Sequence, residues 1–210
     1  MVGISYAILA HNETFELKTL LNKLIGCVTD EDEIIIVLDK PTDEILDLIR
    51  VEFYKPNNFI KCFEHDLNFD FAQQKNFLFS KCTKDYIFNI DADEYPSDYL
   101  LSNIKSILES NSDIGVFHLP RINKVNGITQ EHILRWNWRI DENDWVNFPD
   151  FQCRLIRNNV GIHWEGKVHE KIKGFKSQAY FPEEEDFCLY HIKDIKKQEQ
   201  QNAMYNKIER

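Results

Sequence analysis

Residues Glu33–Leu38 read EIIIVL, an apolar and largely β-branched run that stops abruptly at Asp39. A continuous apolar segment of this length is typical of a parallel strand buried on both faces, whereas a strand with one exposed face alternates apolar and polar residues. The run therefore predicts a central strand of a parallel sheet with helices on both sides.

Strand-like and helix-like segments alternate on either side of this run. Apolar runs predict further strands, and apolar residues at helical spacing predict helices. The expected strands lie at residues 3–10, 60–64 and 86–90, and the expected helices at 14–24, 43–53, 69–80 and 96–110. This alternation predicts right-handed βαβ units, and hence an α/β fold with an open, mostly parallel sheet and helices on both faces.

Polar loops follow three of the predicted strands, at residues 11–13, 39–43 and 91–94. The carboxyl ends of parallel strands meet at one edge of a sheet, and open α/β sheets bind their ligands at that edge. We therefore expect these three loops to converge on one functional site.

The third loop, Asp91-Ala92-Asp93-Glu94, places three acids directly after an apolar strand. Carboxylates this close repel one another unless a cation lies among them. Mg²⁺ and Mn²⁺ prefer carboxylate oxygens and leave coordination positions open for phosphate. If the strand geometry persists, Asp91 and Asp93 lie on the same side and would hold a metal–diphosphate. The alternative is a strand-to-helix junction whose acids only cap the next helix, and we prefer this helix-start role for Glu94.

The composition narrows the class of protein. The chain has 210 residues, 25 of them basic and 35 acidic, for a formal net charge of −10. Phosphate contacts need basic surface, so this balance argues against general nucleic-acid binding. The five cysteines form no C-x-x-C pair, which favours reduced thiols in a cytoplasmic protein. No apolar segment is long enough to predict a transmembrane helix, and peripheral membrane association stays open.

From about residue 115 the pattern changes to shorter strand-like segments, expected at 116–120, 133–140, 151–156 and 161–168. All four tryptophans lie in this half. We expect a smaller mixed β region over the site, with acceptor contacts among its aromatic side chains; the alternative for the tryptophans is core filling. The last segment, 193–210, predicts a polar helix whose role the sequence leaves open.

Six short motifs follow one another in a characteristic order. They are ISYAILAHNE (4–13), EIIIVLD with TD following (33–39 and 42–43), FAQQKN (71–76), IDADE (90–94), PDFQCRLIR (149–157) and WEGKVHE (164–170). Together they resemble the family 2 glycosyltransferases, which have the GT-A fold and transfer a sugar from a nucleotide-sugar donor. The last two are similar to segments of a bacterial and phage branch that includes lipopolysaccharide-core-type glucosyltransferases.

The resemblance covers most of residues 1 to about 192 and implies a division of the chain. Residues 1–114 would form the half that binds the nucleotide-sugar, a UDP-sugar or a similar donor, and residues 115–192 would form the acceptor and catalytic half. Residues 193–210 would follow as a helical tail.

The resemblance also assigns roles around the donor. Asp93 would coordinate Mn²⁺ or Mg²⁺, and Asp91 would contact the ribose or share the metal. His191 would be a further metal or diphosphate ligand, or else a structural histidine. Ala10 and Glu13 would line the nucleotide pocket. Asp39 would accept a hydrogen bond from an N–H group of the nucleobase, and Lys75 would contact the diphosphate. The alternatives are a loop-capping acid for Asp39 and a solvated helix lysine for Lys75.

An inverting transfer needs a base within hydrogen-bond reach of the acceptor hydroxyl. The candidates are Asp150, Glu165, His169 and Glu170, of which we favour Glu170, with Asp150 second. If Val168–Glu170 continues a strand, His169 and Glu170 point to opposite faces and only one reaches the site. His169 and Arg154 are assigned to phosphate binding or to orienting the base, and a core role for His169 stays open.

Two other functions fit parts of the pattern. A nucleotidyltransferase also combines an α/β sheet with paired acids, but it normally has a glycine-rich phosphate loop, which His11-Asn12-Glu13 does not offer. A non-catalytic relic that binds carbohydrate or nucleotide would keep the aromatic second half and leave the metal site idle. The sequence identifies neither the sugar nor the acceptor, which could be a saccharide or another hydroxyl compound.

Overall fold

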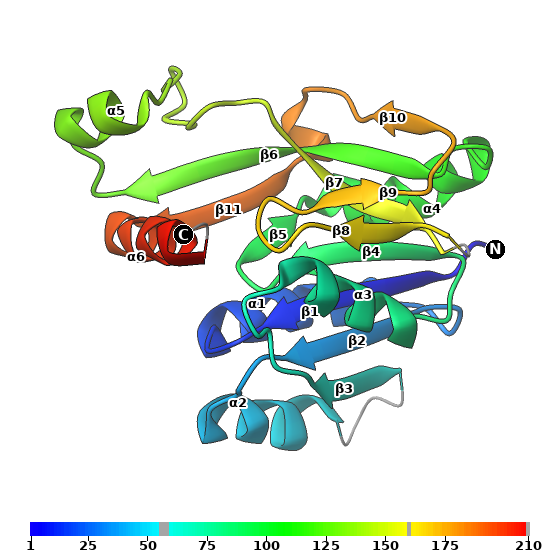
Figure 1. Ribbon diagram of the computed structural model, residues 1–210. Helices are drawn as coiled ribbons and strands as arrows, with labels where there is room; N and C mark the ends of the chain where they lie inside the picture. Colours follow the sequence, from blue (N-terminus) through cyan, green and yellow to red (C-terminus); the bar gives the residue numbers. More distant parts are fainter. Residues whose placement is uncertain (55–58, 159–160, 209–210) are drawn as a thin grey trace.

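The computed structural model describes residues 1–54, 59–158 and 161–208. In its first half, strands and helices alternate as predicted (Figure 1). The elements are β1 (Ile4–Ala10), α1 (Thr14–Ile25), β2 (Glu33–Leu38), α2 (Asp43–Asp47) with a π-helical continuation (Leu48–Tyr54), β3 (Ile60–Glu64), α3 (Phe71–Lys81), β4 (Tyr86–Asp91), β5 (Glu94–Pro96) and α4 (Asp98–Ser110). The apolar run that predicted β2 matches its bounds, and all six of its residues are buried.

The second half adds two long strands, several short ones and two α-helices. The elements are β6 (Val116–Asn126), α5 (Gln130–Trp136), β7 (Asp150–Arg157), β8 (His163–Glu165), β9 (Lys171–Lys173), β10 (Gln178–Tyr180), a 3₁₀ turn (Glu185–Phe187), β11 (Leu189–Asp194) and α6 (Ile195–Ile208). The strand expected at 133–140 is wrong. Thr129 and His132 form a capping box that starts α5, and Asn137 ends this helix in the left-handed conformation.

Among the described residues, nine strands form one curled sheet. Eight of them follow the order β3-β2-β1-β4-β7-β6-β11-β5, and β10 pairs with the start of β6. β3, β2, β1 and β4 run parallel, whereas β7 is antiparallel to both β4 and β6. β8 and β9 form a separate antiparallel hairpin. The α/β, mostly parallel fold with a small additional β region is confirmed.

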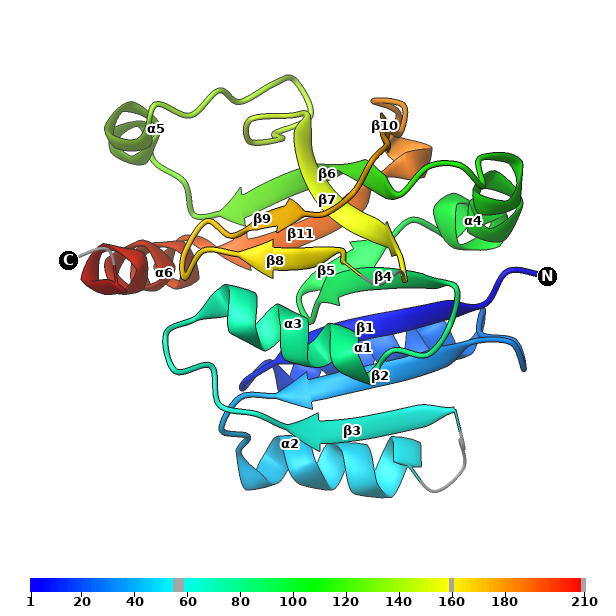
Figure 2. The same ribbon diagram turned by 45° about the vertical axis from the view of Figure 1, so that its right-hand side comes forward.

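Side chains that alternate along β1 and β2 pack against different helices. Ile34 and Ile36 join a large core that includes the buried leucines of α1 and α4, while Ile35 and Val37 pack with Leu78 of α3. In Figure 2, α3 lies in front of the sheet and α1 behind it. This two-sided burial is the physical reason why β2 is apolar at every position after Glu33.

The β8–β9 hairpin is fastened to α3. The Asn76 side chain donates to the Trp164 carbonyl and accepts from the Trp164 amide, both at 2.8 Å. The Phe71 amide also donates to the Lys167 carbonyl at 2.9 Å. These contacts bring the loop between β8 and β9 to the edge at which β1, β2 and β4 end.

No helix in the described part of the chain is long and apolar enough to cross a membrane.

Candidate active site

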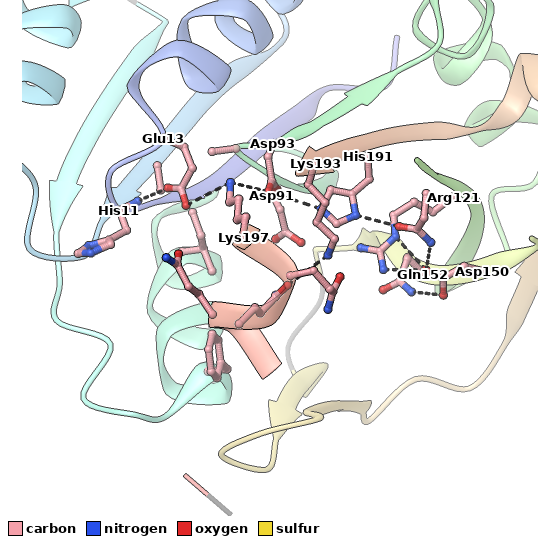
Figure 3. A pocket seen from close by; sticks show the side chains of 18 of the residues that line it. His11, Glu13, Asp91, Asp93, Arg121, Asp150, Gln152, His191, Lys193 and Lys197 are labelled. Atoms are coloured by element: carbon pink, nitrogen blue, oxygen red, sulfur yellow. Dashed lines mark hydrogen bonds and ion pairs between the residues drawn. The ribbon is translucent and has the colours of Figure 1, made fainter. Parts of the chain in front are cut away.

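A cavity of about 800 Å³ lies at the carboxyl ends of β1, β2 and β4 (Figure 3). All but one of the residues that the sequence analysis assigned to the site line it. They are Ala10, Glu13, Asp39, Lys75, Asp91, Asp93, Asp150, Arg154, His169, Glu170 and His191. Glu165 is not among the lining residues; its carboxylate pairs with His163 at 3.0 Å on β8, where both side chains are about half exposed. The fold thus gathers residues from both halves of the chain, while their roles stay predictions.

The two aspartates reach the cavity by a different geometry from the one expected. β4 ends at Asp91, and Ala92 and Asp93 form a turn before β5, so strand alternation does not set their directions. Asp93 Oδ2 lies 3.0 Å from Lys197 Nζ and 3.5 Å from His191 Nε2. Burial disfavours the charged carboxylate, but His191 and Lys197 outweigh it and hold the pKa of Asp93 well below its ordinary value.

The helix-start role preferred for Glu94 is wrong. α4 begins at Asp98 and is capped by Ser97, whose hydroxyl accepts from the Leu100 amide at 3.0 Å. Glu94 lies instead in β5 with a fully buried side chain, and its Oε1 pairs with Arg121 at 2.8 Å and Arg154 at 2.5 Å. It is an internal counter-ion, because a buried carboxylate requires such partners.

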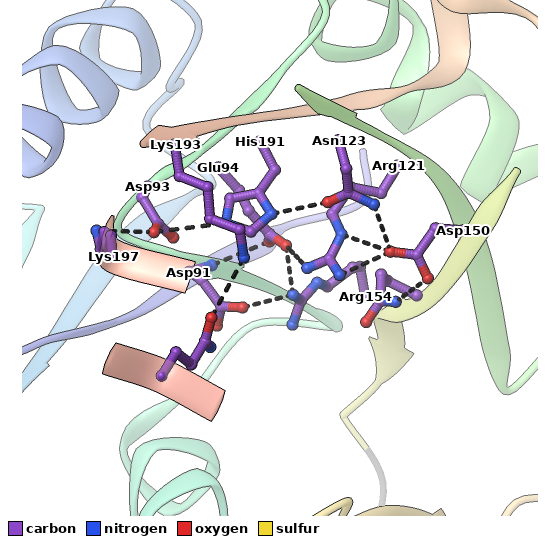
Figure 4. Close-up of polar contacts among 12 residues, drawn as sticks. Asp91, Asp93, Glu94, Arg121, Asn123, Asp150, Arg154, His191, Lys193 and Lys197 are labelled. Carbon is purple, nitrogen blue, oxygen red and sulfur yellow. Dashed lines mark hydrogen bonds and ion pairs between the residues drawn. The ribbon is translucent and has the colours of Figure 1, made fainter. Parts of the chain in front are cut away.

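Arg154 joins Glu94 to the first aspartate of the motif (Figure 4). Its side chain is 3% exposed, and its Nη2 lies 2.6 Å from Asp91 Oδ2. Burial alone would raise the pKa of Asp91, but Arg154 and then Lys75 lower it by their charge. Arg154 therefore keeps Asp91 ionised at the cavity wall.

Strand register assembles a polar row on β7, β6 and β11. Arg121 on β6 lies opposite Asp150 on β7, and His191 on β11 lies opposite Asn123. Asp150 Oδ2 accepts from Arg121 Nη2 at 2.7 Å and from Asn123 Nδ2 at 2.8 Å, while Oδ1 accepts from Gln152 at 2.7 Å. Burial opposes ionisation of Asp150, but Arg121 and then Asn123 keep its pKa below the ordinary value.

This row also determines how His191 presents its ring. Because the Asn123 amide nitrogen donates to Asp150, its oxygen faces His191 Nδ1, 2.8 Å away. The Nδ1–H group must therefore donate to that oxygen, and Nε2 is left facing Asp93. Such a second hydrogen bond is what orients metal-binding histidines in proteins.

The loop between β8 and β9 supplies the other wall. Val168–Glu170 does not continue a strand, and His169 adopts a positive φ of 53°. His169 and Glu170 consequently both line the cavity, in contrast to the opposite directions expected for a strand. Glu170 Oε1 lies 2.5 Å from Lys75 Nζ, and this ammonium stands 4.3 Å from the centre of the Trp164 ring. Lys75 is 10% exposed, so it is not a solvated helix lysine.

The loops after β1 and β2 are held in shape by their own acids. Glu13 Oε2 accepts from the amides of His11 at 2.9 Å and Asn12 at 3.1 Å. Asp39 Oδ1 accepts from the Leu67 amide at 3.0 Å, which is the loop-capping contact considered as an alternative. Asp39 also lines the cavity, with Oδ2 3.8 Å from His11 Nδ1.

The donor groups fit a metal that arrives with phosphate better than a metal held by protein alone. Among the described residues, no group of three or more His, Cys, Asp or Glu side chains is arranged to hold a metal ion. Asp93 and His191 Nε2 nevertheless offer a carboxylate and an imidazole side by side. Mg²⁺ is commonly bound by one or two carboxylates together with substrate phosphates and water. Mn²⁺ also accepts imidazole nitrogen and carboxylate oxygen.

Several cavity residues were not predicted. Arg121, Asn123, Lys193 and Lys197 all line the cavity, as does His11. Arg121 and Asn123 are two residues apart on one strand and therefore share a face of it. That this face lies at the site becomes apparent only once β6 is known to pair with β7. Lys193 and Lys197 are four apart at the start of the polar tail, whose packing the sequence did not indicate.

Trp164 fits both roles considered for the tryptophans, because it is buried in a hydrophobic core cluster and also lines a cavity. Trp138 lines the large cavity, and Trp164 lines a second cavity of about 370 Å³ beside it. The wall shared by the two cavities includes Lys75, Arg154 and Glu170. Trp136 and Trp145 line neither and pack against aromatic neighbours. Acceptor contacts by the first pair stay a prediction.

With this geometry in place, comparison with known proteins identifies the family. Residues 5–162 match the model of "Glycosyl transferase family 2". The chain belongs to this glycosyltransferase family. The match covers most of the chain, so the family resemblance is confirmed, while the lipopolysaccharide-core branch stays a prediction. No curated protein matches the chain.

Solved structures agree with the fold. The crystal structure of S. aureus TarS 1-349 has a TM-score of 0.62 and 13% identity, covering 91% of this chain and 60% of that one. The same S. aureus fragment in complex with UDP has a TM-score of 0.55 and 16% identity, covering 89% of this chain and 62% of that one. At these identities the likeness establishes the GT-A glycosyltransferase fold alone. The family 2 glycosyltransferase chain spans about three fifths of the length of these TarS fragments.

Proposed function

We propose that this chain is an inverting, metal-dependent glycosyltransferase that moves a sugar from a nucleotide-diphosphate donor, a UDP-sugar, to a hydroxyl acceptor. The observation that carries the proposal is the meeting of Asp93 and His191 at the carboxyl edge of the parallel sheet, 3.5 Å apart, in one cavity with Lys75 and Lys197. Family membership favours this activity over a nucleotidyltransferase.

The donor would occupy the large cavity. A cation bound by Asp93 and His191 would stabilise the charge of the leaving diphosphate. Asp91, kept ionised by Arg154, would face the ribose or share the metal. Glu13 and Asp39 would shape the nucleotide loops, and the acceptor would approach from the β8–β9 side, where the two cavities share a wall.

For the base we propose Glu170, with Asp150 as the alternative. Lys75 bonds only one oxygen of Glu170, so Oε2 can accept the acceptor's proton when a hydroxyl lies within reach. Asp150 accepts from Arg121, Asn123 and Gln152, which stabilise its ionised form and make it a weaker proton acceptor. His169 would then bind phosphate or orient the base.

The donor site is tested by titrating Mn²⁺ and a panel of nucleoside diphosphates into the wild type and Asp93→Ala. We expect metal-dependent UDP binding in the wild type and its loss in the variant, because the principal carboxylate ligand is gone. Unchanged binding in Asp93→Ala would refute the assignment. No metal-dependent nucleotide binding in the folded wild type would favour the relic that keeps only the fold.

The base is tested by comparing Glu170→Gln with Asp150→Asn. Glu170→Gln should leave UDP affinity within about twofold while donor turnover, including slow donor hydrolysis, falls by about 10²–10⁴-fold, as for loss of a general base. If Asp150→Asn shows this split between binding and turnover and Glu170→Gln does not, the base is Asp150.

A further inference from the structure

The cation nearest to the Asp93 carboxylate comes from the tail of the chain. Lys197, the third residue of α6, places its Nζ 3.0 Å from Asp93 Oδ2. The same ammonium lies 3.8 Å from Glu16 Oε1 and 3.9 Å from Glu13 Oε1. Figure 3 shows Lys197 reaching in between Glu13 and Asp93. One lysine thus lies within ion-pair distance of three acids at the edge where a donor diphosphate would sit.

The position of this lysine follows from the fold. β11 carries His191 and Lys193 along the cavity, and α6 begins directly after it at Ile195. α6 packs on β11 and β6, and His132 of α5 lies 3.5 Å from Glu199 of α6. These contacts hold α6 so that Lys197 stays beside the cavity. The lysine's flexible four-carbon stem allows its ammonium to move over several ångströms.

Lys197 and a dication cannot both use the present arrangement. A metal at Asp93 would bind about 2.0–2.2 Å from the carboxylate oxygen, which is nearer than the ammonium now lies. Two positive ions would then stand within a few ångströms of each other, a strongly repulsive arrangement in a partly buried site. The ammonium would therefore move away from Asp93 when a metal binds, and the diphosphate that accompanies the metal would offer it a new anionic partner besides Glu13 and Glu16.

We infer that Lys197 is a donor-binding residue with two partners in turn: Asp93 in the free protein and the donor's diphosphate in the metal-bound complex. This inference rests on the proposed function. It makes Lys197 a competitor of the metal when no nucleotide is present and a ligand of the phosphate when both are. The site then favours metal and diphosphate binding together over either one alone.

Mn²⁺ binding to the full chain tests this inference without any turnover assay. Free Mn²⁺ is followed by electron paramagnetic resonance for the wild type, Lys197→Met, Lys197→Arg and the control Lys196→Met. Lys196 is an exposed neighbour on the same helix, so its variant removes an equal charge away from Asp93. Three titrations are run: Mn²⁺ alone, Mn²⁺ with UDP, and Mn²⁺ with inorganic pyrophosphate, which does not depend on the base.

We expect Lys197→Met to change the two affinities in opposite directions. Mn²⁺ alone should bind several-fold more tightly, because its competitor is gone. UDP and pyrophosphate at saturating Mn²⁺ should bind about tenfold more weakly, as expected for loss of one charge-assisted hydrogen bond. Lys196→Met and Lys197→Arg should stay within about twofold of the wild type, since neither removes a positive charge from this position.

The inference is overturned if Lys197→Met matches Lys196→Met in both titrations, or if only one of the two affinities moves. A loss that is seen with UDP and not with pyrophosphate would also overturn it, because the contact would then lie on the nucleoside. Failure of the proposed function looks different: the wild type itself would show no metal-dependent binding of UDP or pyrophosphate.

Discussion

Replacing Arg154 by methionine removes the charge that balances two acids beneath the site. Arg154 is 3% exposed, and its Nη2 lies 2.5 Å from Glu94 and 2.6 Å from Asp91. Burial disfavours the charged guanidinium, but Asp91 and Glu94 outweigh this and raise the pKa of Arg154 above its ordinary value. Methionine fills much of the same volume, so the substitution chiefly deletes charge and hydrogen bonds.

The size of the effect depends on how far water can replace the lost partner. Removing one member of a buried ion pair costs about 3–5 kcal/mol. Glu94 keeps Arg121, 2.8 Å away, and Asp91 is 38% exposed, so both acids retain some compensation. We therefore expect the lower end, a loss of about 3 kcal/mol in the free energy of unfolding. At about 2–4 °C per kcal/mol for a domain of this size, Tm should fall by about 6–12 °C.

Urea unfolding and calorimetry at pH 7 measure this loss, with Arg135→Met as the control. Arg135 also pairs with a glutamate, Glu131, four residues away on α5, but both side chains are more than half exposed. An exposed pair of this kind contributes about 0.3–0.5 kcal/mol. If Arg154→Met costs no more than Arg135→Met, the buried guanidinium does not balance the acids and the reasoning about Glu94 is refuted.

Two further predictions concern other buried carboxylate and amide groups. Burial opposes the charged form of Asp32, but Lys105 and the Thr29 and Ile4 amides outweigh it and lower its pKa. Asp32→Asn should therefore destabilise the fold by about 3 kcal/mol. A carboxylate whose pKa is lower in the folded than in the unfolded chain stabilises the fold at pH values above its unfolded-state pKa. The deficit of Asp32→Asn, measured by urea unfolding, should therefore be constant from about pH 8 to pH 5 and shrink below about pH 4. A deficit that grows on acidification would contradict this. Asn123→Ala removes the acceptor that orients His191 and should weaken Mn²⁺ binding in the presence of UDP by about 10–100-fold by the same resonance assay. Unchanged affinity would remove His191 from the proposed metal site.

Much of the first half could be predicted because its signals are local. The apolar run of β2, the helical spacing of α1 and the Ser97 start of α4 each depend on neighbours within a few residues. The prediction of a strand at 133–140 is wrong for a local reason as well, since the Thr129–His132 capping box starts a helix there. The helix-start role predicted for Glu94 is wrong for a different reason. A polar residue after a strand gives no sign that two arginines from β6 and β7 will surround it.

By itself the sequence determined that parallel strands would end in acidic loops at one edge, because side-chain periodicity and chain connectivity leave few other arrangements. It could not determine which distant groups meet those acids. Arg121 and Arg154 reach them only through the registers of β6 and β7, His191 through that of β11, and Lys197 through the packing of α6. Charge balance in a buried site depends on distances of a few ångströms between residues far apart in the chain, and only the tertiary structure decides those distances.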